Sequence, residues 1–260
     1  MGHIDLELGQ GDAVRVAILC IDALPSTRFA LDMKIQSTVM GRLVVLAVLT
    51  LALSGCKASP TIEVYLSDIV AVASGESKAA TARVSAEVLS KVKCEEEQAK
   101  LVAMLQKVLD GLKDFTCADG KIFGEARFTA SVPIVATDDK GTAKLTNLLE
   151  LAVSKMADRL RVDLILDTSS RMKTLAADIR SQYLYDMGKG EIGTVSLTLV
   201  NDLPADREVI LPVSYVNGAP RAGFTKQTLG RRDKIEIALS NVHSDALRTE
   251  GHVEVFHLMS

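Results

Sequence analysis

The chain has 260 residues, of which 48% are hydrophobic and 24% charged, and its formal net charge is −3. This apolar content excludes a wholly disordered protein, and the even balance of charges provides no basic footprint for a nucleic acid. Trp is absent and only 4% of the residues are aromatic, which argues against surfaces that stack bases or sugar rings.

Residues 1–32 do not resemble the start of an exported protein. Their opening sequence, MGHIDLELGQGDAVRV, carries acidic residues and no basic n-region. We interpret this segment as an over-extended start that is not part of the fold, with translation beginning at Met33 or Met40. A genuine additional segment is the alternative.

An apolar run follows and ends directly at a cysteine. Leu43–Leu53 is shorter than the roughly 20 apolar residues that cross a bilayer, and it lacks the polar face of a helix that borders a core. Lys34 and Arg42 place positive charge before it, and Ser54-Gly55 provides the small residues that a signal peptidase requires. This order predicts a secretory signal peptide at residues 33–55.

The residues Leu53-Ser54-Gly55-Cys56 resemble the lipobox of bacterial lipoproteins, in which small residues precede an invariant cysteine. The resemblance implies cleavage between Gly55 and Cys56, transfer of a diacylglyceryl group to the Cys56 sulfur, and acylation of the new amino terminus. Several acyl chains hold a protein firmly on a membrane that it does not span. Because Lys57 rather than Asp follows the cysteine, the same resemblance implies an outer-membrane location, facing the periplasm of a Gram-negative cell.

Cys94 and Cys117 form an even pair in a chain that we expect to be exported. An oxidising compartment favours a disulfide between such cysteines, and the closed loop would contribute about 3 kcal/mol in the chain-entropy description. Two separate buried thiols are the alternative. No CxxC spacing occurs and no histidine lies nearby, so neither a redox site nor a metal site is expected here.

The mature chain begins with predicted strands and a helix. Residues 56–60 are expected to form a lipidated tether, followed by an apolar segment, Thr61–Ala73. In Lys78–Leu89 apolar and polar residues alternate, which predicts a strand with one buried face. Apolar residues at helical spacing then predict a helix over Glu95–Leu112, with acidic residues in its first turn, where they suit the helix dipole.

The middle of the chain contains one ambiguous segment. Lys121–Ala136 alternates like a strand, and the turn Asp138–Gly141 predicts a hairpin. The returning residues, Ala143–Met156, fit either a helix or a strand, and the turn favours the strand. Leu160–Leu166 is predicted as a further strand. It is followed by a helix that Ser169 or Ser170 caps and that ends near Tyr185.

The C-terminal part is predicted to consist of short strands and turns. Thr194–Val200 and Arg207–Tyr215 are expected to form a hairpin around Pro204–Asp206, and Pro212 indicates an edge strand. Asn217-Gly218 is typical of a two-residue hairpin turn. Two more strands are expected at Lys234–Leu239 and His252–Leu258.

Together these elements predict an α+β fold, mainly an antiparallel sheet with two or three helices and an all-β C-terminal part. We expect an α+β domain at residues 61–187. Residues 188–260 form either a small all-β domain or a continuation of the same core.

The segment Gly188-Lys189-Gly190-Glu191-Ile192-Gly193 has the spacing GxGxxG. A nucleotide-binding loop of this type lies between a buried strand and a helix, so that the helix amino terminus meets the pyrophosphate. Here the motif follows a predicted helix and precedes a predicted strand. We therefore expect no nucleotide, and we interpret the glycines as a flexible junction.

Three histidines and two glutamates near the C terminus could indicate zinc: His243, His252, His257, Glu250 and Glu254. On a strand, residues an odd number of positions apart point to opposite faces, which separates His252 from His257. We therefore expect surface histidines and no metal.

No catalytic residues are assigned, and no cofactor is expected. A GxSxG nucleophile motif does not occur. Asp163 and Asp167 could act as an acid–base pair, but Asp163 alternates with apolar neighbours, which favours a solvated strand face. A mild basic cluster could meet lipid phosphates or an anionic partner, although a solvated loop is the simpler interpretation. Its members are Arg221, Lys226, Arg231, Arg232 and Lys234.

Our leading hypothesis is a non-enzymatic lipoprotein that is attached to the membrane through acyl chains on Cys56 and binds another protein or component of the envelope. An exposed apolar patch or sheet edge would support it. A lipid carrier is the first alternative, and it would show a deep apolar pocket. An envelope hydrolase would show a cleft that gathers Asp or Glu with His. A prophage-type surface-exclusion lipoprotein is a further alternative.

Overall fold

The computed structural model describes residues 57–121, 123–137, 145–183 and 193–259. The chain divides into two units, Met1–Ser54 and Gly55–Ser260, and all described residues belong to the second. The predicted over-extended start, the signal peptide and Cys56 lie outside the described residues.

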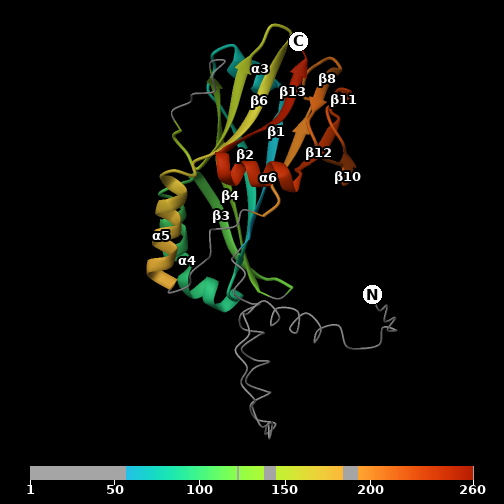
Figure 1. Cartoon of the computed structure of the whole chain (residues 1–260). Coiled ribbons are helices and arrows are strands. Elements are labelled where there is room, and N and C mark those ends of the chain that lie inside the picture. The colour runs from blue at the N-terminus through green and yellow to red at the C-terminus, as the bar shows by residue number, and fades with distance from the viewer. Residues whose placement is uncertain (1–56, 122, 138–144, 184–192, 260) are drawn as a thin grey trace, which may run out of the picture. The chain divides into compact units, whose positions relative to one another are not determined.

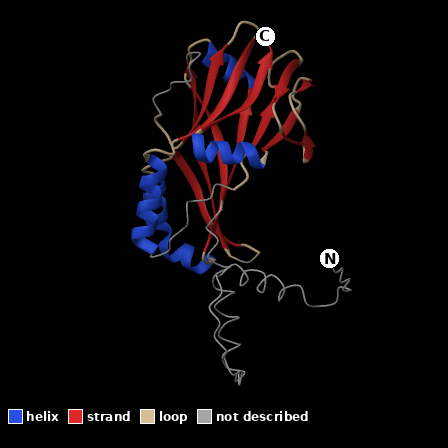
Figure 2. Ribbon diagram, in the orientation of Figure 1, coloured by secondary structure: helices blue, strands red, loops and turns tan. Residues whose placement is uncertain are grey.

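Thirteen strands and four helices occur in the described residues, and all the strands belong to one sheet (Figure 1; Figure 2). The strands are β1 (Ala58–Tyr65), β2 (Lys78–Val88), β3 (Asp110–Asp119), β4 (Gly124–Thr137), β5 (Leu149–Lys155), β6 (Arg159–Leu166), β7 (Ser196–Val200), β8 (Arg207–Leu211), β9 (Ser214–Val216), β10 (Ala219–Arg221), β11 (Thr225–Leu229), β12 (Lys234–Leu239) and β13 (His252–Met259). The helices are α3 (Leu66–Ala73), α4 (Lys91–Leu105), α5 (Arg171–Tyr183) and α6 (Asn241–Glu250).

The sheet curls until it is nearly closed. Its strand order is β10-β9-β12-β7-β1-β2-β4-β5-β6-β13-β8-β11, with β3 added beside β4. The strands at the two ends of this order, β10 and β11, are separated in sequence only by residues 222–224. Because a connection of that length spans at most about 15 Å, the two edges of the sheet must approach each other. We call residues 212–229, which hold both edges, the seam.

The predicted α+β class with two or three helices is therefore wrong, because the fold is mostly β. One cause is the predicted helix Glu95–Leu112. Helix α4 ends at Leu105, and β3 begins at Asp110. Gly111 has a φ of 60°, and a Cβ at this position would lie 2.3 Å from the Ser131 Oγ of β4. This close approach lets the chain join β4 as a strand where the apolar spacing alone predicts a helix.

Alternating residues fill the interior of the curled sheet. On β12, Ile235 and Ile237 are buried, whereas Lys234 and Glu236 are exposed. Helix α6 joins β12 to β13, which other strands separate in the sheet, and it contacts both of them. The helix therefore crosses between two sides of the curl. The helices α3 and α6 add four residues to the same core: Leu66, Ile69, Val72 and Leu247.

Strand β4 has a different neighbour along each part of its length. On one side it pairs antiparallel with β2, from Ile134 to Gly124. On the other side, β3 pairs antiparallel with its first half, and β5 pairs parallel with Ile134–Thr137. The predicted β4–β5 hairpin is therefore wrong, because a hairpin joins antiparallel strands, whereas β4 and β5 pair parallel. Part of Ala143–Met156 is a strand, as predicted, and the turn Asp138–Gly141 lies outside the described residues.

Clear alternation predicts several elements correctly. The segments Lys78–Leu89, Leu160–Leu166 and Lys234–Leu239 correspond to β2, β6 and β12, and the helix predicted after Ser170 is α5. Asn217 and Gly218 have φ angles of 48° and 76° between β9 and β10. These positive values are what a two-residue hairpin turn requires.

Three other parts of the chain differ from prediction. The segment Thr61–Ala73 divides into β1 and α3 after Tyr65. Arg207–Tyr215 divides at Pro212 into β8 and β9, since proline has no N–H for the ladder. Helix α6 is not predicted at all, although Ser240 marks its start by accepting a hydrogen bond from the His243 N–H (3.3 Å).

The predicted hairpin around Pro204–Asp206 does not form. Strand β7 lies between β1 and β12, whereas β8 lies between β13 and β11. The fully buried Asn201 controls this connection, because its Nδ2 lies within hydrogen-bonding distance of the carbonyls of Ala205 (3.0 Å), Leu229 (2.8 Å) and Gly230 (3.2 Å). This side chain ties the end of β7 to the loop before β8 and to the end of β11.

Candidate functional site

The fold begins immediately after the predicted lipid attachment point. The Lys57 carbonyl accepts a hydrogen bond from the Glu87 N–H (3.0 Å), and Ala58 pairs with Ala86. The predicted tether is therefore wrong for residues 58–60, which belong to β1 because the long strand β2 needs a partner for its backbone groups. Gly55 and Cys56 lie outside the described residues, so cleavage and lipidation there stay predictions. In the part of the chain that the structure describes, no helix has the length and apolarity to cross a membrane.

The predicted disulfide between Cys94 and Cys117 is present. The two sulfur atoms are 1.99 Å apart and the two Cα atoms 5.9 Å apart. The bond joins α4 to β3, and the buried residues of α4 are Cys94 itself and Met104. The bond thus adds a covalent attachment to a helix with little buried apolar surface.

Asp163 and Asp167 are buried, but they do not form a pair. Their exposed fractions are 7% and 3%. Asp163 accepts a hydrogen bond from Arg161 Nε (3.0 Å), whereas Asp167 binds the residues that begin α5. The solvated face predicted for Asp163 is wrong, because its strand is flanked on both sides: Ala152 of β5 and Glu254 of β13 lie opposite it.

A charged cluster connects β6 and β13 on the Asp163 face of the sheet. Arg161 Nε lies 3.0 Å from Asp163 Oδ1 and 3.4 Å from Glu254 Oε2. His257 Nε2 is 3.1 Å from Glu254 Oε1, although these two atoms are not oriented for a hydrogen bond. Burial raises the pKa of Asp163, and the Arg161 charge opposes that rise. The His257 ring lies beside Phe224 of the seam, with ring centroids 6.3 Å apart.

A β-bulge brings His257 into this cluster. The pairing of β13 with β6 shifts by one residue after Glu254. As a result, His252 and His257 pair with Ile165 and Arg161, which point to the same face of β6. The prediction that these histidines face opposite sides is wrong, and so is the predicted surface position of His257, which is 8% exposed. Sequence alternation cannot show an inserted residue of this kind.

The cluster has a histidine and carboxylates but lacks the surroundings of a catalytic or metal site. Among the described residues, no group of three or more His, Cys, Asp or Glu side chains could hold a metal ion. The described residues also form two open hollows on the surface, and neither of them contains this cluster. One is bordered by Val70 and Arg207 and the other by Arg83 and Arg127. The cluster therefore lies outside both of these hollows, and its charges are directed at one another.

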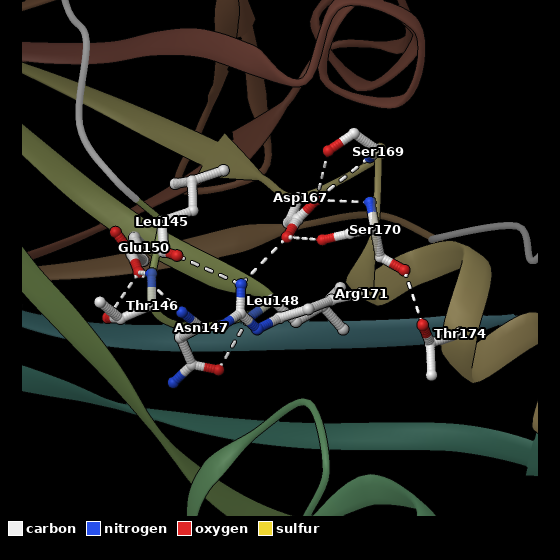
Figure 3. Close-up of polar contacts among 10 residues, drawn as sticks. All are labelled: Leu145, Thr146, Asn147, Leu148, Glu150, Asp167, Ser169, Ser170, Arg171 and Thr174. Carbon is white, nitrogen blue, oxygen red and sulfur yellow. Dashed lines mark hydrogen bonds and ion pairs between the residues drawn. The ribbon is translucent and has the colours of Figure 1, made fainter.

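Asp167 organises a second polar cluster, which Figure 3 shows. Its Oδ1 accepts hydrogen bonds from the N–H groups of Ser169 (3.1 Å) and Ser170 (2.9 Å), and its Oδ2 accepts from Arg171 Nη1 (3.1 Å). The hydroxyls of both serines also donate to it. Burial alone would raise the pKa of Asp167, but these hydrogen bonds outweigh burial and hold the pKa well below its usual range. Asp167, rather than the predicted Ser169 or Ser170, thus binds the free N–H groups before α5.

Glu150 of β5 does the same for the preceding loop (Figure 3). Its Oε1 accepts from the N–H and hydroxyl of Thr146 and from the N–H of Asn147 (2.7 Å). Its Oε2 is buried and has no hydrogen-bond partner in the described part of the chain. Arg171 Nη1 joins the two clusters by donating to the Leu145 carbonyl (3.2 Å). Sequence reasoning missed Glu150, because a single carboxylate in an apolar run gives no signal of a turn. Asp167 could have been recognised, since an Asp two residues before Ser-Ser is typical of a turn.

Two sequence motifs remain, the GxGxxG segment and the basic cluster. Of the GxGxxG segment, only Gly193 is described, and its N–H donates to the Ala58 carbonyl (2.8 Å) as the chain enters β7. In the basic cluster, Lys226 pairs with Glu208 (3.5 Å) and Lys234 pairs with Glu63 (3.7 Å). These partners offset part of the positive charge.

The seam carries three large exposed apolar side chains. Val213 is 43%, Tyr215 42% and Phe224 70% exposed. All three residues of β10 are also exposed. No strand of the described residues pairs with the outer edge of β10 or β11. The seam is therefore an exposed sheet edge that carries large apolar side chains.

A family model described as a domain of unknown function, DUF7424, matches residues 59–259, which extend from β1 to β13. No curated protein and no solved structure matches the chain.

Proposed function

Because the chain belongs to the DUF7424 family, whose description names no activity, we propose a function from its own residues. It is a lipid-anchored envelope protein that faces the periplasm and binds a protein partner through the seam, without catalysis. The observation that carries the anchor is the order of segments: the apolar run, the lipobox ending at Cys56, and a folded body that begins one residue later.

The disulfide supports export. Cys94 and Cys117 are bonded in the fold, and such bonds persist in oxidising compartments such as the periplasm. A folded body with this bond suits a protein whose leader directs it out of the cytosol.

The seam supports a binding role. Exposed sheet edges recruit extended partner segments by backbone hydrogen bonding, and apolar side chains beside the edge add specificity. Tyr215 and Phe224 are large side chains of this kind at the seam. The buried carboxylates of Glu150, Asp163 and Asp167, in contrast, accept their hydrogen bonds from the protein's own backbone and side chains.

The alternatives have less support. A lipid carrier needs a deep apolar cavity, whereas side chains of the strands, α3 and α6 fill the interior as one core. A hydrolase needs its acid, base and nucleophile around a cleft, and the cluster of Asp163, Glu254 and His257 borders neither hollow. A surface-exclusion lipoprotein shares the anchor and the seam, and it differs only in having a surface receptor as the partner.

The anchor is tested by expressing the full chain in a Gram-negative host and measuring the mass of the processed protein. The expected product begins at Cys56 and carries a diacylglyceryl group and a third acyl chain. Cys56→Ala should leave the leader uncleaved, and Cys20→Ala should behave as wild type. An unmodified Cys56 thiol on a chain that retains its leader would contradict the proposal.

The partner is tested by photo-crosslinking in intact envelopes. A photoreactive amino acid replaces Tyr215 or Phe224 at the seam, and Val242, which is 74% exposed on α6, provides the matched control. We expect a discrete adduct from the seam positions and none from position 242. Equal adducts from all three positions, or none from the seam, would exclude the seam as the binding surface.

A further inference from the structure

Five ends of secondary structure meet at one end of the folded body, which we call the tip. The tip consists of Lys57, Glu87–Lys93, Asp119–Lys121 and Phe123–Gly124. Gly124, the first residue of β4, pairs with Val88 at the end of β2 and with Asp119 at the end of β3. A Cβ on Gly124 would lie 2.3 Å from the Ser90 carbonyl carbon, so the start of α4 packs against the same point. Figure 1 shows these ends together, away from α3 and the C terminus.

The start of β1 fixes the predicted anchor to the tip. Lys57 is held by the hydrogen bond from the Glu87 N–H to its carbonyl (3.0 Å). Covalent geometry places the Cα of Cys56 about 3.8 Å from that of Lys57, whatever the conformation of Cys56. Leu89 is only two residues from Glu87, which binds Lys57. Acyl chains on Cys56 would therefore be attached close to Leu89.

Two large apolar side chains are exposed at the tip. Leu89 is 55% and Val92 64% exposed. Two of the four lysines of the tip, Lys91 and Lys93, are paired with carboxylates. Lys91 Nζ lies 3.9 Å from both Glu95 and Asp119, and Lys93 Nζ lies close to Glu96 and Glu97. The tip thus presents two exposed apolar side chains beside lysines whose charge is partly offset, and these side chains favour contact with lipid by apolar burial.

We infer that the tip rests on the bilayer, with Leu89 and Val92 in the membrane interface; this inference depends on the proposed lipid anchor at Cys56. Without a flexible tether, the anchor holds the body in one orientation. The long strands β2 and β4 lead away from the membrane, and the seam is presented to the periplasm.

The absence of Trp from the chain provides a clean test. Leu89→Trp, Val92→Trp and, as the matched control at the seam, Phe224→Trp each introduce one fluorophore at an exposed apolar position. Each variant is expressed as the full chain, purified with its acyl chains, and reconstituted in phosphatidylethanolamine–phosphatidylglycerol vesicles that contain a brominated lipid. Tip fluorescence should shift to shorter wavelength and be quenched by bromine, equally at low and high salt, whereas Phe224→Trp should show neither effect.

Mass spectrometry of the same samples separates the two proposals. Acylated protein whose tip fluorophores are not quenched would overturn the tip contact and leave the anchor intact. Unacylated protein that does not remain with the vesicles would overturn the anchor itself. Equal quenching at position 224 would show a body without fixed orientation and would also overturn the inference. Circular dichroism confirms that each variant is folded.

Discussion

Asp167 gathers five hydrogen bonds on one buried carboxylate: from the N–H and hydroxyl groups of Ser169 and Ser170, and from Arg171. These bonds favour its charged form and lower its pKa. A lowered pKa in the folded state means that the charge stabilises the fold at pH values above the pKa in the unfolded chain, about 3.9. The stabilisation is lost as the pH falls through that value and below it. Asp167 therefore contributes to acid sensitivity.

We expect Asp167→Asn to lower the free energy of unfolding at pH 7 by about 1–3 kcal/mol, because the amide group turns donors toward Ser170 and Arg171. The deficit should shrink as the pH falls from about 5 to about 3, where wild type loses the same stabilisation. Urea unfolding of both proteins across this range measures it. Asp158→Asn is the control, since that carboxylate is 60% exposed and pairs only with the neighbouring Arg159 among the described contacts. A deficit that stays constant with pH would show that the Asp167 charge is not its source.

At the scale of elements, alternation predicts strands well and their partners poorly. β2 and β12 follow from period two, because each buries one face. β6 is also recognised as a strand, although Asp163 on its other face is buried as well. The parallel pairing of β4 with β5 does not follow, because the same residues would fit a hairpin and only the packed structure decides between the two. Helix α4 and strand β3 share one apolar pattern, and the close approach of Gly111 to Ser131 separates them.

The candidate sites also include features that the sequence predicts and features that it does not. The disulfide could be predicted because two cysteines leave one simple pairing in a chain that is expected to be exported. The His257–Glu254 contact could not, because it depends on a bulge that adds one residue to β13. Glu150 could not be predicted either, since a single carboxylate in an apolar run gives no sign of the turn that it binds. The seam depends on strand order, which pairs residues far apart in the chain.

The disulfide is an element-scale device, since it attaches α4 to β3. Replacing both cysteines, as Cys94→Ala with Cys117→Ala, should cost about 3 kcal/mol in the chain-entropy description. The loss should be concentrated in residues 91–119, because α4 has few buried side chains to hold it. Hydrogen exchange by mass spectrometry should show faster exchange there, with β7 and β12 unchanged.

Reduction of the wild-type protein should reproduce this pattern, because it breaks the same bond without changing a side chain's size. Uniformly faster exchange over the whole sheet would contradict a local role. It would mean that the bond stabilises the core, not only the attachment of α4.

At the scale of the whole molecule, the sheet is continuous across the predicted domain boundary at residue 187. β1 pairs with β2 on one side and with β7 on the other, and β13 returns to pair with β6. The buried residues of β7, β12 and β13 belong to the same core as those of β1 and β5. Neither residues 57–187 nor residues 188–260 can then bury their apolar face alone, and residues 57–260 should unfold cooperatively.

We therefore expect residues 57–260 to unfold in a single transition and residues 57–187 alone not to fold. Removing the C-terminal part would uncover the edges of β1 and β6 and expose Ile62 and Val64, which are fully buried. A long, apolar, unpaired edge of this kind drives aggregation rather than independent folding. Circular dichroism and urea unfolding of the two polypeptides measure the difference. A cooperative transition in the shorter one would mean that residues 57–187 have a core of their own, and the curled sheet would then be two domains joined edge to edge.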